Sequence, residues 1–233
     1  MHEEEQCCLL IGNSRWHWAL KKNNKWQFIN TSIKDQYHQF LEVPLLAWAA
    51  VGEMPTEISL DPLLEVKIEE IPLQNCPNWL GIDRALAAWG AFYTANKALN
   101  MHPNGLLIAD AGTILSITRI SANGQFIGGQ LIPGLHLQLT SMATGTKNLI
   151  YPSIQDLPTE AFPLTTEAAM LQGTYQALLG TLIEAHQKAN VPIWLCGGDA
   201  PVLIHGLKQR KIEVIHHPNL VLEGMLNLRN HSL

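Results

Sequence analysis

Short apolar runs separated by turn residues dominate the first part of the chain and predict β-strands. The four runs are Cys7–Ile11, Trp16–Leu20, Trp26–Asn30 and Leu45–Val51. Glycine and asparagine stand between them, where a chain reverses direction easily. The Ala- and Leu-rich stretch Arg84–Leu99 has no proline and predicts a helix. The first part of the chain is therefore predicted to form a sheet that is followed by a helix.

Strands and helices follow one another again in the second part of the chain. Further strands are predicted at Leu106–Ala109, Ile114–Ile120, Phe126–Ile132, Ile193–Cys196 and Ile212–Ile215. Further helices are predicted after Pro133-Gly134, after the candidate N-cap Thr165, after Gly197-Gly198-Asp199 and around Leu220–Leu228.

This repetition predicts two α/β halves, residues 1–104 and residues 105–233. A short internal echo supports the division. Gly12-Asn13-Ser14 and Gly112-Thr113 each close the first strand of one half, and their glycines lie 100 positions apart. A single pair of this kind also arises by chance, so the division depends on further motifs.

The charge balance excludes a nucleic-acid binder that works through bulk positive charge. The chain has 233 residues, 15 basic and 20 acidic, which gives a net charge of −5, and its pI is about 6.0. The start MHEEEQ is unlike the basic head of a signal peptide, and the longest apolar stretches are too short to span a bilayer. None of the four cysteines forms a CxxC pair, which favours free thiols in a reducing compartment. We therefore expect a cytoplasmic protein.

Common nucleotide-binding and hydrolase motifs are missing from the chain. It contains no GxxxxGKS/T, GxGxxG, GxSxG or HExxH, and its ten histidines have no metal-ligand spacing. The two glycine hairpins, Gly12-Asn13-Ser14 and Gly112-Thr113, remain. Such loops bring backbone N–H groups close to phosphate oxygens, although a tight β-turn is the simpler explanation of each.

Charged side chains stand at the ends of two predicted elements. Asp110 follows an apolar strand, where a buried carboxylate is costly unless it is paired or bound to a cation. A cation site and a capped turn both account for it. Asp83 stands just before a predicted helix, either as its N-cap or as the acceptor of a substrate proton, and Arg84 can bind a carboxylate through two parallel hydrogen bonds. Spacing alone does not decide between these alternatives.

Six short segments stand in order along the chain: IGNS (Ile11–Ser14), GIDR (Gly81–Arg84), DAGT (Asp110–Thr113), GGQLIPGL (Gly128–Leu135), TEAAMLQG (Thr166–Gly173) and GGDA (Gly197–Ala200). Together they resemble type III pantothenate kinase, a family of the acetate-and-sugar-kinase, heat-shock-protein and actin superfamily. The resemblance implies an α/β fold with two similar actin- or ribonuclease-H-like halves, each a mixed sheet flanked by helices, with a cleft between them.

The same resemblance implies an activity. The family transfers the γ-phosphoryl group of ATP to pantothenate, giving 4′-phosphopantothenate in the first step of coenzyme A biosynthesis. It implies Mg2+ and a monovalent cation (K+ or NH4+) as cofactors, and a homodimer without nucleic-acid or membrane partners. The predicted helix carries small residues that could meet across a two-fold axis, although packing inside one subunit explains them equally well: Ala87, Gly90, Ala91 and Ala95.

The resemblance also assigns roles to individual residues. The nucleotide contacts would be Ile11, Gly12, Asn13, Ser14, Arg15 and Thr113. The substrate contacts would be Gly81, Ile82, Asp83, Arg84 and Thr166. Asp83 would also accept the proton of the substrate hydroxyl, and Asp110 would bind the monovalent cation.

Two positions depart from the family pattern. Leu10 stands where the family usually has an aspartate that helps to hold magnesium, and Asp110 could take up part of that role. Gln74 stands where the family tends to have an aromatic substrate contact. The change at Leu10 leaves an alternative open, namely a nucleotide-binding accessory or regulatory protein with impaired catalysis. A third possibility is a related kinase that acts on another small hydroxylated acid.

Overall fold

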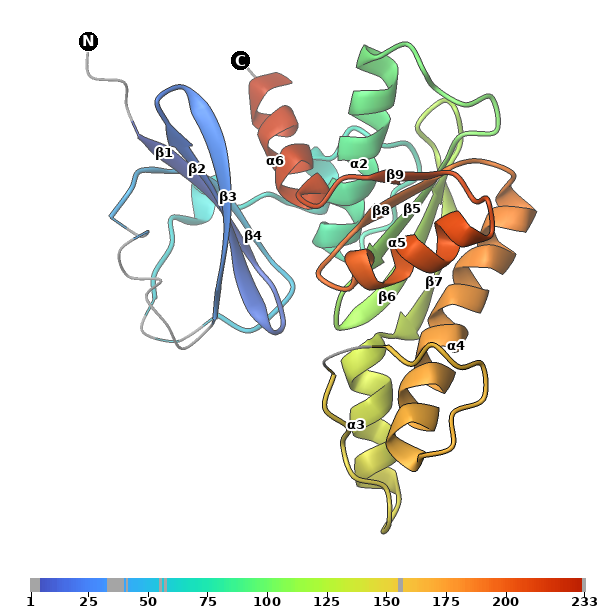
Figure 1. The fold of residues 1–233 in the computed structure, drawn as a ribbon. Coiled ribbons are helices and arrows are strands. Elements are labelled where there is room, and N and C mark those ends of the chain that lie inside the picture. The colour runs from blue at the N-terminus through green and yellow to red at the C-terminus, as the bar shows by residue number, and fades with distance from the viewer. Residues whose placement is uncertain are drawn as a thin grey trace. The chain divides into compact units, whose positions relative to one another are not determined.

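The computed structural model describes residues 5–32, 40, 42–54, 56, 58–154 and 157–231, and Figure 1 shows its helices and strands. The chain forms two compact units. The first consists of Met1–Gly105, Arg119–Ile127 and Asn219–Leu233, and the second of Leu106–Thr118 and Gly128–Pro218. The first of these boundaries, after Gly105, lies one residue from the division expected after residue 104. Arg119–Ile127 and the residues from 219 onward also belong to the first unit, so each unit is built from separate stretches of chain.

The sheet of the first unit is mixed and has the strand order β3-β2-β1-β4. Its strands are β1 (Gln6–Ile11), β2 (Arg15–Lys22), β3 (Lys25–Ser32) and β4 (Leu45–Ala50). β1 pairs antiparallel with β2 and parallel with β4, and β2 pairs antiparallel with β3. The tight turn between β2 and β3 is made by Asn23 and Asn24, both with positive φ, as the hairpin geometry requires.

Side chains alternate between the two faces of this sheet. On one face, Cys7, Leu9 and Ile11 of β1 form a core with Trp16 and Trp18 of β2. The remaining β1 side chains point to the other face, where α6 (Leu220–His231) packs against β1. This second face includes the Leu10 side chain, which is only 5% exposed.

The helices of the first unit, α2 (Ile82–Lys97) and α6, pack closely against each other. A Cβ atom on Gly90 would lie 2.7 Å from the carbonyl oxygen of Leu220, and one on Gly224 would collide with the carbonyl oxygen of Leu86. The small α2 residues Ala87, Ala91 and Ala95 are buried as well. They therefore serve packing inside the subunit rather than a two-fold contact, and the homodimer remains a prediction that this helix does not support.

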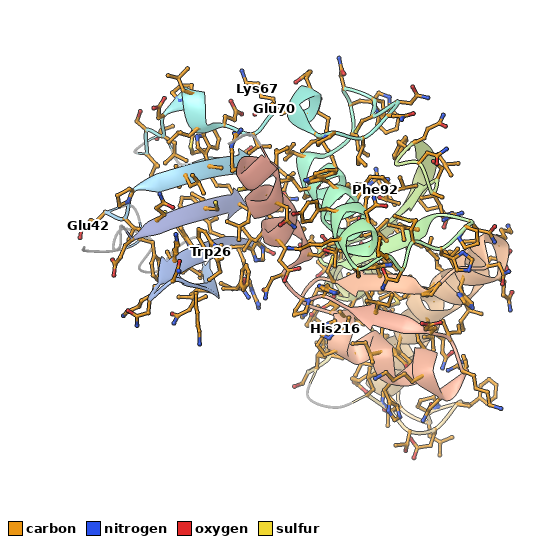
Figure 2. The ribbon with its side chains drawn as sticks, turned by 90° about the horizontal axis from the view of Figure 1, so that it is seen from above. Trp26, Glu42, Lys67, Glu70, Phe92 and His216 are labelled. Carbon is orange, nitrogen blue, oxygen red and sulfur yellow. The ribbon has the colours of Figure 1, made fainter. Side chains whose placement is uncertain are left out.

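Two short 3-10 turns, η1 (Pro62–Leu64) and η2 (Ile68–Glu70), lie between β4 and α2. The η2 turn is closed by the Lys67 backbone N–H, which donates to a Glu70 carboxylate oxygen at 2.8 Å, and Figure 2 shows these two residues side by side. The other Glu70 oxygen forms a 2.6 Å ion pair with Arg229 of α6. This pair ties the connection to the C-terminal helix.

The second sheet has the order β7-β6-β5-β8-β9. Its strands are β5 (Leu106–Ala111), β6 (Ile114–Ile120), β7 (Phe126–Pro133), β8 (Ile193–Cys196) and β9 (Val214–His216). β5, β8 and β9 are parallel, whereas the two-residue link between β5 and β6 makes that pair antiparallel. The last strand begins at Val214 and not at the expected Ile212, because the Ile212 N–H closes the preceding helix on the Leu207 carbonyl.

Three helices flank the second sheet: α3 (Leu135–Gly145), α4 (Thr166–Ala189) and α5 (Ala200–Gln209). α3 and α4 lie side by side (Figure 1) and contact each other. α4 begins as expected, with the Thr165 hydroxyl accepting the Ala168 N–H. The predicted pattern of two mixed sheets flanked by helices is thus confirmed. Among the helices described, none is both long and apolar enough to cross a membrane.

Candidate active site

The first glycine hairpin joins β1 to β2. The Gly12 N–H donates to the Arg15 carbonyl at 3.0 Å, and a Cβ atom on Gly12 would lie 2.7 Å from that same oxygen. Glycine is therefore required at this position. Ile11 and Gly12 are buried, whereas Asn13 and Ser14, like Arg15, are exposed. The tip of the hairpin thus presents polar groups at the end of a buried strand.

The second glycine hairpin joins β5 to β6 in the other unit. The Gly134 N–H donates to the Thr113 carbonyl at 2.9 Å, and a Cβ atom on Gly134 would collide with the Gly112 carbonyl. The hairpin is therefore held by the start of α3, while the Thr113 side chain remains exposed. The segment Gly128–Leu135, noted in the sequence as a motif, supports the Gly112-Thr113 loop in this way.

Asp110 lies near the carboxyl end of β5, where it contacts the end of β8. Gly197 has a φ of 90°, and a Cβ atom there would collide with Asp110 Oδ1 and with the Ala111 carbonyl. The Asp199 N–H donates to that carbonyl at 2.8 Å. Ligands commonly bind at the carboxyl ends of parallel strands, where these residues meet. The GGDA motif signalled this contact, although Gly197 and Asp199 were not among the expected site residues.

A histidine–tyrosine pair adjoins Asp199 without any signal in the sequence. His136 Nδ1 and the Tyr151 hydroxyl are 2.6 Å apart, and their rings are nearly parallel, with an interplanar angle of 11°. Burial and the negative charge of Asp199 raise the pKa of Tyr151. Because the pair joins the start of α3 to a distant loop, only the folded chain brings it together.

Asp83 lies in the first turn of α2, which begins at Ile82 with Gly81 as its N-cap. The N-cap role considered for Asp83 is therefore wrong, because the N-cap lies two residues earlier, at Gly81. Its Oδ1 instead accepts the Arg84 N–H at 2.7 Å. Burial raises the pKa of Asp83, while the Arg84 N–H and guanidinium act in the opposite direction. The carboxyl group is therefore held in place and is a stronger base than an exposed aspartate.

Arg84 is 9% exposed, which is unusual for an arginine. Burial lowers the pKa of Arg84, whereas Asp83 and then Cys76 favour its charged form. A buried guanidinium next to a carboxylate at a helix start is suited to binding an anion such as a substrate carboxylate.

An exposed aromatic side chain stands two residues before Gly81. The Trp79 indole is 74% exposed and its ring meets Phe126 edge to face, with centroids 6.3 Å apart. Phe126 is in turn tied to Gln74, because its N–H donates to the Gln74 carbonyl at 2.9 Å. The Trp79–Phe126 pair therefore lies beside Gln74, the position where the family tends to have an aromatic side chain. The sequence pattern did not reveal this pair.

The expected site residues divide between the two units. Ile11–Arg15 and Gly81–Arg84 lie in the first, and Asp110, Thr113 and Thr166 lie in the second. Thr166 begins α4 and is exposed. Within the part of the chain that the structure describes, no group of three or more His, Cys, Asp or Glu side chains could hold a metal ion. The binding roles of all these residues remain predictions.

The fold belongs to a class that includes small-molecule kinases. The chain matches acetate kinase from Entamoeba histolytica with a TM-score of 0.53 and 8% identity, covering 98% of this chain and 99% of that chain. It also matches a protein from Campylobacter jejuni, described as a conserved Baf family transcriptional activator, with a TM-score of 0.63 and 21% identity over 97% and 98% of the two chains. At such identities the likeness shows the fold alone, and it confirms the predicted fold class.

Sequence comparison defines the family. The family model described as type III pantothenate kinase matches residues 64–188, which is more than half of the chain. A type III pantothenate kinase from Synechococcus elongatus is 30% identical over 243 residues, which covers 93% of each chain. The chain therefore belongs to the type III pantothenate kinase family, as its short motifs predicted. The matched range contains Gly81–Arg84, Asp110, Thr113 and Thr166, and it begins after the first hairpin.

Proposed function

We propose that this chain is an ATP-dependent pantothenate kinase that forms 4′-phosphopantothenate, the first step of coenzyme A biosynthesis. The observation that carries the proposal is the pair at the start of α2. There the buried Arg84 stands next to Asp83, a carboxylate with a raised pKa that is fixed by a backbone N–H. Membership in the family supports pantothenate as the alcohol that these residues serve.

Asp83 would orient the substrate hydroxyl and accept its proton. Phosphoryl transfer passes through a loose transition state, so positioning and charge neutralisation do most of the work. A base works best when its pKa approaches the working pH, and burial moves the pKa of Asp83 in that direction. The 2.7 Å bond from the Arg84 N–H holds one carboxylate oxygen in place at the start of the helix.

Arg84 would bind the carboxylate of pantothenate. Because Arg84 is buried, water competes less for its guanidinium group and the side chain has less freedom to move. Pantothenate also carries an apolar dimethyl group close to its phosphorylated hydroxyl. The exposed Trp79 ring packs against Phe126 and would provide an apolar wall for that group. It would replace the aromatic residue that the family tends to have where this chain has Gln74.

Each of the two glycine hairpins would contribute backbone N–H groups to the binding of the nucleotide phosphates. Mg2+ keeps several waters and takes few protein ligands besides substrate phosphates. Bound Mg2+ would neutralise charge on the transferring phosphoryl group. Asp110, held beside Gly197, would contribute a carboxylate oxygen to the K+ or NH4+ site.

Two further parts of the proposal concern the whole molecule. A cytoplasmic location is proposed from the cysteine pattern, and burial of Cys7, Cys8 and Cys196 is consistent with structural free thiols. A homodimer is proposed from the family resemblance. Light scattering tests it, with a mass near 52 kDa, twice the 25.9 kDa of the chain, as the expected result and a monomer as the contrary one.

An ADP-release assay with pantothenate, ATP, Mg2+ and K+ tests the activity. Turnover that requires pantothenate supports the kinase. Nucleotide binding without turnover supports the alternative, a nucleotide-binding accessory protein whose catalysis is impaired by Leu10. Turnover with another small hydroxylated acid but not with pantothenate would assign the chain to a related kinase.

A further inference from the structure

Leu10 and His17 face each other across β1 and β2. They are directly paired in the antiparallel register, so their side chains stand on the same face of the sheet. Leu10 is 5% exposed and offers no polar atom to the neighbouring Gly12 loop. The polar group nearest to it along this row of the sheet is therefore the His17 imidazole.

The His17 ring spans the distance between an anchor and the loop. Its Nδ1 lies 2.7 Å from Oδ1 of Asn30, the residue paired with it on β3. Its other nitrogen, Nε2, lies 3.4 Å from the position that a Cβ atom would occupy on Gly12. Asn30 therefore fixes the ring while the opposite edge of the ring lies against the first glycine hairpin.

This arrangement determines which nitrogen can accept a hydrogen bond. With the Asn30 carbonyl oxygen as acceptor, Nδ1 carries the proton, and a neutral imidazole then presents an unprotonated Nε2. Burial lowers the pKa of His17 and the positive charge of Arg15 acts in the same direction, while the bond to Asn30 opposes them. A lone pair next to the hairpin is thus the expected state of the ring.

We propose that His17, oriented by Asn30, supplies at the Gly12 hairpin the hydrogen-bond acceptor that Leu10 lacks, so that Nε2 accepts a hydrogen bond from a water molecule of the hydrated Mg2+ that accompanies the nucleotide. A carboxylate at position 10 and an imidazole at position 17 would reach the same side of the hairpin, because the two positions are cross-strand neighbours. The inference rests on the proposed nucleotide binding of this hairpin, and it names a residue of this chain that compensates for the change at Leu10.

The test compares ADP binding with Mg2+ and in EDTA, measured by calorimetry in the absence of pantothenate. For His17→Ala, the gain in ADP affinity that Mg2+ provides should fall about 10-fold, which corresponds to about 1.4 kcal/mol, while the affinity in EDTA changes little. Asn30→Ala should show a smaller loss of the same kind. Because Asn30 is exposed, this variant leaves the buried atoms unchanged and is expected to fold.

Two controls sharpen the result. His205 is also a histidine in contact with a side-chain amide, since its Nε2 lies 2.7 Å from Nε2 of Gln209, but it is on α5. His205→Ala should therefore leave the Mg2+ effect intact. Adding Leu10→Asp to His17→Ala should restore the Mg2+ effect, since it returns an acceptor to the same face.

The inference is overturned if His17→Ala and Asn30→Ala keep the full Mg2+ effect. It is also overturned if they lose ADP affinity equally in EDTA, since that result would indicate a direct phosphate contact. These outcomes are separate from those of the proposed function, which fails when Mg2+–ADP binds normally and yet no phosphopantothenate forms.

Discussion

The Asp83 carboxylate accepts a hydrogen bond from the backbone N–H of the next residue, Arg84, at 2.7 Å. Both side chains lose hydration in the folded chain. This burial raises the pKa of Asp83 and lowers the pKa of Arg84. The mutual attraction of the two charges offsets only part of this cost. Charged groups whose burial is only partly compensated are typical of functional sites.

Asp83→Asn should lower kcat by about 10²–10⁴, because the amide keeps the shape of the side chain but cannot accept a proton. Steady-state ADP release with saturating pantothenate and ATP measures the effect. Asp61→Asn is a matched control, since Asp61 also accepts a nearby backbone N–H, from Leu63 at 2.9 Å. An unchanged kcat in Asp83→Asn would remove this residue from the mechanism.

The same substitution should stabilise the protein at neutral pH. The raised pKa means that the folded chain binds the Asp83 proton more tightly than the unfolded chain does. The stability from this group is therefore complete below its ordinary pKa of 3.8 and is lost as the pH rises through the folded-state pKa. Asp83→Asn should melt higher than the parent at pH 7, by about 2–4 °C for each kcal/mol relieved. Thermal melts from pH 4 to pH 7 should show this difference growing with pH, and a lower melting temperature at pH 7 would contradict it.

Arg84→Lys should raise KM for pantothenate at least 10-fold, with little change in KM for ATP. Lysine keeps the positive charge but loses the planar fork that holds a carboxylate through two hydrogen bonds. Arg210→Lys, at an exposed position at the end of α5, provides a comparison for general effects of the exchange. Equal rises in both KM values for Arg84→Lys would count against pantothenate binding.

Gly197→Ala should disturb the Asp110 site, whereas Gly198→Ala should not. The added Cβ at position 197 meets Asp110 Oδ1 and the Ala111 carbonyl at a φ of 90°, while a Cβ at position 198 has no atom within 4 Å. Activity titrated with K+ should show a weaker or abolished K+ response in Gly197→Ala only. If both variants respond to K+ like the parent, Asp110 does not hold the cation.

Gly224→Ala should destabilise the first unit by forcing α2 and α6 apart, because its Cβ would collide with the Leu86 carbonyl. Gly180→Ala in α4 is the control. Nothing lies within 4 Å of a Cβ at that position, and alanine in a helix interior is worth about 0.5–1 kcal/mol over glycine. Urea unfolding should therefore shift in opposite directions for the two variants. Equal shifts would contradict the close packing of α2 and α6.

Most strands and helices could be predicted from the sequence, because their apolar periodicity and turn residues are local signals. The membership of α6 in the first unit could not, since the contact between Gly90 and Gly224 joins residues far apart in the chain. The N-cap of α2 could not be located from the sequence, because the cap is Gly81, which has no side chain to signal it, and the helix begins at Ile82. The position of His17 beside the first hairpin could not be predicted either, because its orientation depends on the strand register that places Asn30 opposite it.

The central claim is that Asp83 serves phosphoryl transfer to pantothenate. Mass spectrometry of a reaction with ATP, Mg2+, K+ and pantothenate tests it most directly, with Asp83→Asn run in parallel. The account predicts one 4′-phosphopantothenate for each ADP. The variant should form it at least about 100-fold more slowly, which is the lower end of the rate gain that a positioned base provides. A chain that binds the nucleotide and yields no phosphopantothenate, or a variant as fast as the parent, would contradict it.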